Sequence, residues 1–282
     1  MGHNSITSNI TKEDIIAEIR LTLSADFDRK KCIVVVEGED DYLFFNGKLD
    51  SDTEVKESFS GKIGVQEIVD SFSDYRVIGI RDHDFDTLSS SSQMLYYDYN
   101  CLEMMLISQD PAFYQFCCAY YIGAVKPLDV RLQLLDGLKW LSFYRKLNSD
   151  NDWGINFQGI SISRAFDQNS KTIQITNLTD QIKRTNPNKV SDISNQLIAV
   201  TNASNTPCDL DGYLCITQGH DFLFHFQTLC EAVRPYKSKS PGAAELFRAL
   251  VCSYNKEDFS NSALYQTLTD YQNQHNLRIL AT

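Results

Sequence analysis

The chain has 282 residues, of which 43% are hydrophobic and 22% charged, and its formal net charge is −11. These values are ordinary for a globular protein that buries a substantial core. They argue against a broad nucleic-acid-binding surface, since proteins that hold phosphates usually cluster Lys and Arg. No apolar run approaches the roughly 18 residues of a membrane span, and the polar start 1–5 does not resemble a secretory signal. We therefore expect a cytoplasmic protein without membrane contact.

An amphipathic helix is the first predicted element. Thr11 and Asp14 are suited to cap its start. Apolar residues follow this cap at helical spacing, at Ile15, Ile16, Ile19 and Leu23. The pattern predicts an N-terminal helical segment within residues 1–30.

The next part of the chain predicts a parallel sheet. Strands and helices alternate in this order: strand 32–37, a helix from Glu39 to Gly47, strand 53–59, a turn at 61–64, a helix through Ile68 and Val69, and strand 77–80. Apolar strands that alternate with helices are typical of a parallel α/β sheet.

Acidic residues follow two of these strands. Glu37 ends the first strand and Asp41 follows it, whereas the third strand leads into Asp82, Asp84 and Asp86. The carboxyl ends of parallel strands form the sheet edge where ligands bind. Carboxylates crowded there repel one another unless a cation neutralises them, and hard oxygen ligands select Mg²⁺ or Mn²⁺. The sequence therefore predicts a divalent-metal site.

The spacing of the second acidic segment predicts which side chains share a face. If the backbone stays extended, Asp82 and Asp84 lie on one face and His83 points away, as a structural residue or a substrate contact. The polar run 87–93 predicts a loop beside the site. Taken alone, either acidic segment also fits an ordinary acidic turn after a strand.

A fourth strand and a helix supply two further carboxylates. Residues 94–97 predict the strand, and residues 100–108 predict a helix with Glu103 near its first turn. Glu103 either supports the metal cluster or is a favourable charge at a helix N-terminus. Asp98 is open to the same two interpretations.

These motifs together resemble the Toprim domain, in which a strand ending in Glu-Gly precedes a βα unit and a strand ending in Asp-x-Asp. Glu37-Gly38 with Asp41 is similar to the first motif, and Asp82-His83-Asp84 is similar to the second. The segment 97–103 resembles the strand-to-helix segment of a bacterial Toprim-like family. That family includes the nuclease subunit of the two-gene ATPase–Toprim anti-phage systems of the PARIS type. The resemblance covers residues 31–108 and is weak elsewhere.

The resemblance implies a Toprim-like Rossmannoid domain and a metal-dependent nuclease related to OLD-type Toprim nucleases. Glu37 would be a metal ligand or general base, and Asp82 and Asp84 would be metal ligands. Supporting roles would fall to Asp41, His83, Asp86 and Glu103. The expected cofactor is Mg²⁺, with Mn²⁺ as a substitute. The resemblance also implies an RNA substrate, with tRNA favoured, and an OLD- or ABC-like ATPase partner that restrains the nuclease.

The remainder of the chain predicts mainly helices. The elements are an aromatic helix at 112–121, longer Leu-rich helices from about 125, a polar interval at 165–206, a helix at 242–251 begun by Ser240-Pro241, and a last helix at 261–271. We therefore expect an N-terminal helical segment (1–30), a Toprim-like domain (31–124) and a mainly helical C-terminal region (125–282).

Two other motifs have simpler explanations than a catalytic or nucleotide site. Gln218-Gly219-His220-Asp221 resembles a phosphohydrolase His-Asp pair, but a glycine stop and an Asp near a helix start explain it more simply. His220 as an acid or phosphate contact remains the alternative. Residues 60–63 lack a phosphate-loop pattern, since Lys56 and Ile63 occupy positions that need Gly and Ser or Thr. We therefore expect no nucleotide cofactor and no ATP hydrolysis by this chain.

Cysteine and basic residues yield no site of their own. The cysteines show no Cys-x-x-Cys spacing, which favours reduced, buried thiols: Cys32, Cys101, Cys117, Cys118, Cys208, Cys215, Cys230 and Cys252. Basic stretches occur at Lys139/Arg145/Lys146, Lys183/Arg184/Lys189 and Arg234/Lys237/Lys239. These stretches fit solvated surfaces, although a homodimer or a partner would assemble them into one groove.

The sequence thus predicts a Mg²⁺-dependent phosphodiesterase that cleaves RNA as an anti-phage effector. Three alternatives stay open. They are a non-catalytic metal-binding Toprim module, a DNA-directed OLD-like nuclease, and another Toprim enzyme such as a primase or topoisomerase. A primase would usually bring a zinc module and a basic channel, and a topoisomerase needs a large gate with a tyrosine.

Overall fold

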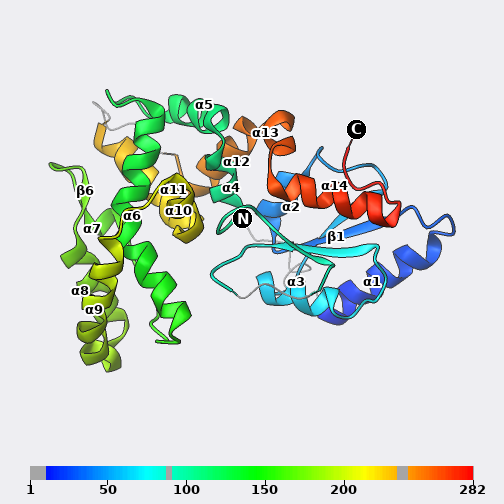
Figure 1. The fold of residues 1–282 in the computed structure, drawn as a ribbon, viewed down its shortest axis with the longest axis horizontal. Coiled ribbons are helices and arrows are strands. Elements are labelled where there is room, and N and C mark those ends of the chain that lie inside the picture. The colour runs from blue at the N-terminus through cyan, green and yellow to red at the C-terminus, as the bar shows by residue number, and fades with distance from the viewer. Residues whose placement is uncertain (1–10, 87–90, 234–240, 282) are drawn as a thin grey trace, which may run out of the picture. The chain divides into compact units, whose positions relative to one another are not determined.

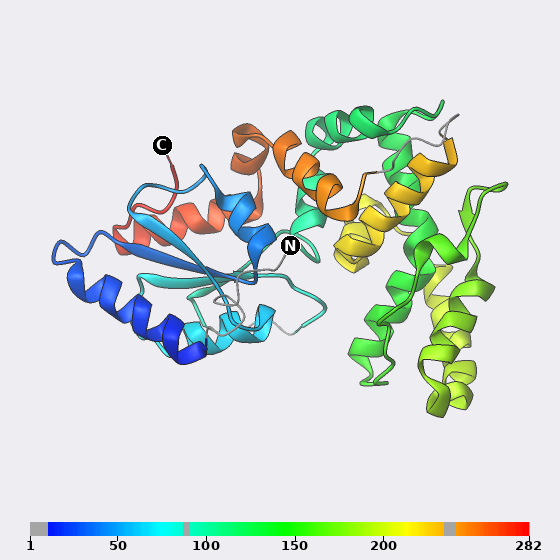
Figure 2. The same cartoon turned by 180° about the vertical axis from the view of Figure 1, so that it is seen from behind.

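The computed structural model describes residues 11–86, 91–233 and 241–281, which form two compact units. The sheet unit comprises residues 11–83, 91–98 and 256–281, and the helical unit comprises residues 84–86, 99–233 and 241–255. Figures 1 and 2 show the elements of each unit from opposite sides. The prediction of an α/β protein with a parallel sheet is confirmed.

The sheet unit is built on four parallel strands. They are β1 (Cys32–Val36), β2 (Thr53–Glu57), β3 (Val77–Arg81) and β4 (Met94–Tyr96). Their order across the sheet is β2-β1-β3-β4, and Ile33 of β1 pairs with Val77 of β3. Every residue of β1 and β3 is buried, as expected for central strands that are covered on both faces.

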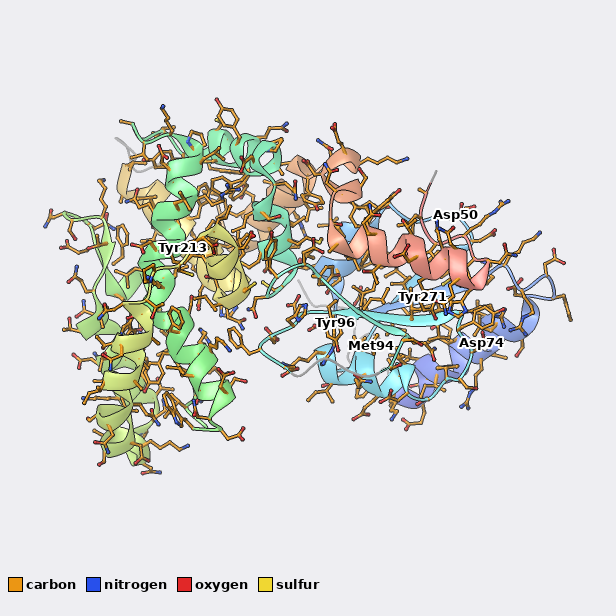
Figure 3. All side chains as sticks on the ribbon, viewed as in Figure 1. Asp50, Asp74, Met94, Tyr96, Tyr213 and Tyr271 are labelled. Atoms are coloured by element: carbon orange, nitrogen blue, oxygen red, sulfur yellow. The ribbon has the colours of Figure 1, made fainter. Side chains whose placement is uncertain are left out.

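Helices cover both faces of this sheet. The helices α1 (Lys12–Ala25) and α3 (Gly61–Val69) lie on one face, and α2 (Glu39–Phe45) and α14 (Ala263–His275) lie on the other (Figures 1 and 2). One apolar core joins α1, α3 and the sheet through Ile15, Ile16, Ile19, Leu23, Ile33, Val35, Val65, Ile68, Val69, Val77 and Met94. Met94, labelled in Figure 3, therefore belongs to the α1–α3 side of the sheet.

Aromatic rings fill the opposite face. The ring of Phe44 packs edge-on against Phe45, Tyr97 and Phe259, with centroid distances of 4.9, 6.1 and 5.4 Å. Phe259 comes from α13 (Lys256–Ser260), the short helix before α14. The C-terminal segment therefore completes the core of the sheet unit.

The predicted cap of the first helix is confirmed. The hydroxyl of Thr11 accepts the backbone N–H of Asp14 at 3.2 Å, and the carboxylate of Asp14 accepts the backbone N–H of Thr11 at 2.9 Å. These two reciprocal hydrogen bonds satisfy backbone donors that the helix itself leaves unpaired. The pKa of Asp14 is lowered because its carboxylate accepts both the backbone N–H and the side-chain hydroxyl of Thr11.

Two local predictions need correction. The expected turn at 61–64 is instead the first turn of α3, which begins at Gly61 with a φ of +50°. Gly64 lies in a closely packed position, because a Cβ there would lie 3.0 Å from the side chain of Ser58. The predicted loop 87–93 is described only at residues 91–93, and residues 87–90 lie outside the described part of the chain.

The predicted domain boundaries also differ from the two units. The segment 11–30 and residues 256–281 belong to the sheet unit, whereas residues 99–124 belong to the helical unit. Two contacts anchor the C-terminal segment: the Tyr271 hydroxyl donates to the Tyr75 carbonyl at 2.7 Å, and Leu49 forms an antiparallel bridge with Leu280. Burial of an apolar stripe on α14 explains this return to the sheet.

The helical unit contains helices and one small hairpin. Its elements are α4 (Leu102–Ser108), α5 (Asp110–Tyr120), α6 (Pro127–Asp150), α7 (Ile162–Ala165), β5 (Phe166–Asp167), β6 (Thr172–Ile173), α8 (Ile175–Thr185), η2 (Pro187–Lys189), α9 (Val190–Ser204), α10 (Leu210–Ile216), α11 (Gly219–Val233) and α12 (Ala243–Ser253). The polar interval 165–206 therefore holds the hairpin, α8 and α9. The predicted cap Ser240 lies outside the described residues, and α12 begins at Ala243 with Gly242 as its N-cap.

Candidate functional site

The carboxyl edge of the parallel sheet joins two predicted site residues. Glu37 follows β1 and Asp82 follows β3, and these strands are neighbours in the sheet. The Glu37 carboxylate oxygen Oε1 accepts the backbone N–H of Asp82 at 2.9 Å. Its second oxygen, Oε2, lies beside the start of α3, where a Cβ at Gly61 would be 3.7 Å away. Glu37 is therefore held at the edge by the backbone of the adjacent strand end.

Asp41 is held at the same edge by two hydrogen bonds. Its Oδ2 accepts the backbone N–H of Gly38 at 3.1 Å, and its Oδ1 accepts the hydroxyl of Tyr97 at 2.6 Å. The side chain of Tyr97 is completely buried among aromatic rings, and only 8% of Asp41 is exposed. The carboxylate is consequently locked in one orientation.

The pKa of Tyr97 responds to the charges of all three carboxylates at this edge. Burial raises its pKa well above the ordinary value, and the negative charges of Asp41, Asp82 and Glu37 raise it further, in that order. A phenol in these surroundings stays protonated, so its hydroxyl can donate the hydrogen bond to Asp41. We call Glu37, Asp41, Asp82 and Tyr97 the edge cluster.

The predicted geometry of Asp82 and Asp84 is wrong. Strand β3 ends at Arg81, and the backbone turns left-handed at Asp84 and Phe85, with φ angles of 47° and 66°. The alternation of faces in a strand therefore does not apply to these residues. His83 instead packs its ring against Tyr96 at a centroid distance of 4.9 Å. Left-handed φ angles in two consecutive non-glycine residues are uncommon and mark a constrained turn.

After this turn, Asp84 and Asp86 belong to the helical unit. There the Asp84 oxygen Oδ1 accepts the side-chain amide of Gln218 at 3.0 Å, and its backbone N–H donates to the carbonyl of Asn100 at 3.2 Å. Asp86 is half-buried. Gln218 was absent from the predicted site, because no local pattern connects it with a residue so distant in sequence.

Glu103 lies against the first residue of a helix other than its own. A Cβ placed on Gly219 would collide with the Glu103 carboxylate, so this carboxylate sits at the N-terminus of α11. A negative charge at that position stabilises the helix. The structure therefore supports the interpretation of Glu103 as a favourable charge at a helix N-terminus. Its carboxylate lies at the start of α11, and Glu103 itself belongs to the first turn of α4.

Asp98 has a comparable structural role in the sheet unit. Its two carboxylate oxygens accept the backbone N–H groups of Ala263 and Leu264, at 2.7 and 2.8 Å. These groups belong to the first turn of α14. Asp98 thus anchors the C-terminal helix.

The remaining residues of the Gln218–Asp221 motif are also engaged. Asp221 forms a bidentate ion pair with Arg145, through Nε at 2.8 Å and Nη2 at 3.2 Å. Only 15% of the Arg145 side chain and 7% of the Asp221 side chain are exposed, so Arg145 is not the solvated surface residue that the sequence predicted. The ring nitrogen Nε2 of His220 lies 3.5 Å from Nη2 of Arg145.

The edge cluster offers only oxygen donors, which suits Mg²⁺ better than softer metals. Among residues 11–86, 91–233 and 241–281, however, no group of three or more His, Cys, Asp and Glu side chains is close enough to hold a metal ion. Mg²⁺ commonly binds through one or two carboxylates and retains several waters, so the donors fit this ion without a complete protein cage.

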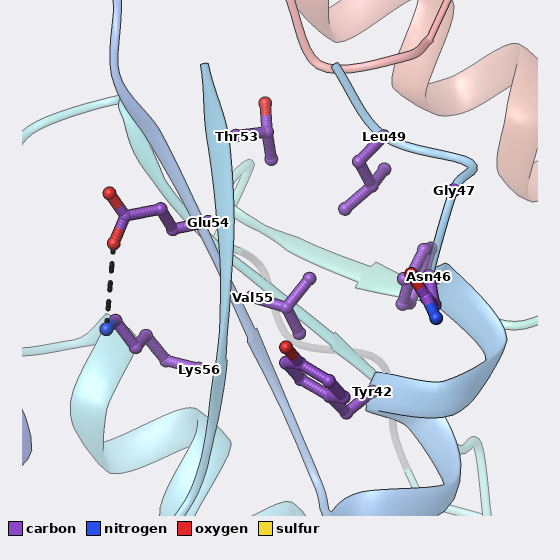
Figure 4. Close-up of a pocket in the computed structure, with 9 residues that line it drawn as sticks. Tyr42, Asn46, Gly47, Leu49, Thr53, Glu54, Val55 and Lys56 are labelled. Carbon is purple, nitrogen blue, oxygen red and sulfur yellow. Dashed lines mark ion pairs between the residues drawn. The ribbon is translucent and has the colours of Figure 1, made fainter. Parts of the chain in front are cut away.

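A separate pocket of about 370 Å³ lies beside the edge strand β2 (Figure 4). Tyr42 of α2 and Val55 of β2 line it, together with an ion pair between Glu54 and Lys56 at 3.6 Å. No residue of the edge cluster lines this pocket. It therefore does not provide the cleft of the candidate site.

Comparison with known proteins identifies no family for this chain. No protein-family model and no curated protein matches the chain. None of the helices in the described residues has the length and apolar character that crossing a membrane requires. The class that the fold defines is an α/β protein with a four-stranded parallel sheet.

Proposed function

We propose that the chain is a Mg²⁺-dependent phosphodiesterase of the Toprim-like class. The observation that carries this proposal is the hydrogen bond between the Glu37 carboxylate and the backbone of Asp82. It joins two acidic residues at the carboxyl ends of neighbouring parallel strands, the edge where α/β sheets bind ligands. Both residues are those that the Toprim resemblance selects.

The edge cluster assigns a different task to each residue. Glu37, whose Oε1 accepts the Asp82 N–H, is proposed as a metal ligand or general base. Asp82 contributes a carboxylate from the adjacent strand end. Asp41, held by Tyr97 and Gly38, supplies a fixed negative charge beside them. Asp84 is proposed as a ligand from the resemblance, in an orientation set by Gln218.

When bound, Mg²⁺ or Mn²⁺ would supply polarisation of a phosphate ester and a water of lowered pKa. Carboxylates that are already oriented need little rearrangement to meet such an ion. Three neighbouring negative charges also favour cation binding over binding of a bare phosphate. A chain of net charge −11 is consistent with the use of metal ions to approach nucleic acid.

The substrate and the partners rest on the resemblance alone. We propose an RNA substrate, with tRNA favoured, an OLD- or ABC-like ATPase as the controlling partner, and a role as an anti-phage effector. A DNA-directed nuclease is the alternative within the same chemistry.

A second candidate function is a non-catalytic Mg²⁺-binding module. The absence of a three-ligand group in the described residues favours it, because hydrolysis by paired metals would use more ligands than one structural ion. Such a module would bind the ion and gain stability without cleaving any substrate.

The test incubates the full chain with total tRNA, single-stranded RNA or duplex DNA, in Mg²⁺, Mn²⁺ or chelator. We compare Glu37→Gln and Asp82→Asn with Glu13→Gln and Asp270→Asn, which remove equal charges from exposed helix positions. Cleavage that is lost in both site variants and in chelator, and kept in both controls, supports the nuclease. If no substrate is cut while Mg²⁺ raises the melting temperature of the wild type but not of Asp82→Asn, the non-catalytic module is correct. Equal cleavage by all variants rejects the edge cluster.

A further inference from the structure

A cavity of about 370 Å³ in the helical unit is lined by no residue of the proposed site. Its walls come from α6, the β5–β6 hairpin, the start of α8, the end of α9, and α11. Its lining includes Asp136, Lys139, Trp140, Lys171, Ile173, Ile175 and His225. A volume of this size is sufficient for a small metabolite.

Two lysines give this cavity a cationic character. Lys139 has no hydrogen bond or ion pair with any described residue and lies 5.7 Å from the ring centre of Tyr213, which Figure 3 labels. Within the described part of the chain, Lys171 donates only to a carbonyl oxygen, that of Ala232 at 3.1 Å. The one carboxylate of the wall, Asp136, already accepts the Tyr213 hydroxyl at 2.6 Å. The cations therefore exceed the anions in the wall, in a chain that is acidic as a whole.

The start of α8 adds backbone donors. Ile175 is its first residue, and the N-cap Gln174 makes no capping hydrogen bond with its side chain. The backbone N–H groups of residues 175–177 have no acceptor among the described residues, since the first bond of this helix is donated by Leu178 to Gln174. An eleven-residue helix with free N–H groups at its start attracts an anionic group.

His225 supplies an independent polar side chain that is almost completely buried. Only 3% of this residue is exposed, and its Nδ1 lies 3.1 Å from the carbonyl oxygen of Leu134. A carbonyl can only accept, so Nδ1 carries the proton and Nε2 is left as an acceptor. Nε2 has no partner among the described residues, and burial lowers the pKa of His225 to about 4, which keeps the ring neutral. His225 lines the cavity, so its Nε2 can accept a hydrogen bond from a ligand that carries a donor.

These requirements describe one class of molecule. The lysines and the helix start call for an anionic group, His225 calls for an amino or hydroxyl donor, and Trp140 with Ile173 and Ile175 supplies apolar walls. We infer that the cavity binds a nucleoside monophosphate, with its phosphate near Lys139, Lys171 and the start of α8 and with an amino group of its base on His225. Such binding needs no phosphate loop and is independent of the proposed nuclease activity.

The first test is calorimetry on the full chain with AMP, adenosine and inorganic phosphate. We expect AMP to bind, adenosine to bind at least tenfold more weakly, and phosphate alone to bind more weakly than AMP. Lys139→Met should weaken AMP binding roughly tenfold by removing one charged contact, whereas Lys126→Met, at an exposed position outside the cavity, should not change it. Phosphate binding as tight as that of AMP would reduce the cavity to an anion site and overturn the nucleotide assignment.

The second test needs no variant. In the nitrogen NMR spectrum of the wild type, Nε2 of His225 should resonate as an unprotonated ring nitrogen and shift when AMP is added. An unchanged Nε2 resonance at saturating AMP, or no binding of AMP at millimolar concentration, overturns the proposal. Neither readout depends on cleavage of nucleic acid, so failure here and failure of the nuclease proposal are separate results.

Discussion

The hydroxyl of Tyr97 donates a hydrogen bond of 2.6 Å to Asp41 inside the aromatic core of the sheet unit. The bond connects a fully buried side chain with a carboxylate at the functional edge. This one contact therefore contributes both to the stability of the sheet unit and to the orientation of Asp41. A change in either partner should be visible in both.

Tyr97→Phe should lower the free energy of unfolding by about 1.5–3 kcal/mol, because it removes a charge-assisted hydrogen bond and leaves Asp41 with one donor fewer. Urea denaturation measures this loss. Tyr114→Phe, at a position that is 53% exposed, is the control and should change stability little. A loss of less than 0.5 kcal/mol for Tyr97→Phe, on the order of a surface substitution, would contradict a buried bond to a carboxylate.

Asp82→Asn should abolish cleavage and leave the metal-free protein as stable as the wild type, or more stable. The substitution relieves repulsion with Glu37 and Asp41, whereas the hydrogen bond to Glu37 uses the backbone of residue 82 and is retained. Thermal melting in chelator, beside Asp270→Asn, checks the prediction. Strong destabilisation of Asp82→Asn in chelator would show that the three carboxylates do not repel one another.

Glu103→Gln distinguishes the two roles of this residue. If Glu103 serves the N-terminus of α11, the loss of its charge should cost about 0.5–1 kcal/mol of stability, equally with and without Mg²⁺. Chemical denaturation in Mg²⁺ and in chelator measures both values. A cost that appears only in Mg²⁺ would instead make Glu103 a metal ligand.

Because His225 is buried, we expect the free energy of unfolding to fall at acidic pH. Its pKa of about 4 lies below the ordinary 6.5, so the unfolded chain binds the proton more tightly than the folded one. The stabilisation is complete above pH 6.5 and is lost as the pH falls from 6.5 to about 4, by about 3 kcal/mol. Unfolding measured across this interval should show a shallower pH dependence in His225→Gln than in the wild type. Parallel curves would mean that this imidazole does not resist protonation.

Gly79→Ala should destabilise the sheet unit by about 1–3 kcal/mol through overpacking. A Cβ on this residue of β3 would lie 2.7 Å from the Met94 sulfur and 2.8 Å from Val65. Gly242→Ala, where a Cβ meets no atom within 4 Å, is the matched control. Equal stabilities of the two variants in urea would refute the close approach of α3 to β3.

Local sequence patterns were sufficient to predict the main strands and helices of the sheet unit. The apolar runs at β1 and β3, the cap at Thr11 and the order of strands and helices were all predicted, because they depend on propensity and on hydrophobic period. Parallel strand order also predicted that Glu37 and Asp82 would meet at one edge. The turn after Arg81 was missed, since an Asp-x-Asp pattern does not reveal where extended backbone becomes left-handed.

The sequence by itself determined a parallel α/β sheet with acidic strand ends, because neighbouring residues and their spacing set both features. Only the tertiary structure decided which distant groups those acids meet: Tyr97 for Asp41, Gln218 for Asp84, and the first turns of α14 and α11 for Asp98 and Glu103. It also decided that the C-terminal helix returns to the sheet. The physical reason is that a carboxylate takes the nearest available donor in the folded chain, and that donor can lie more than a hundred residues away in sequence.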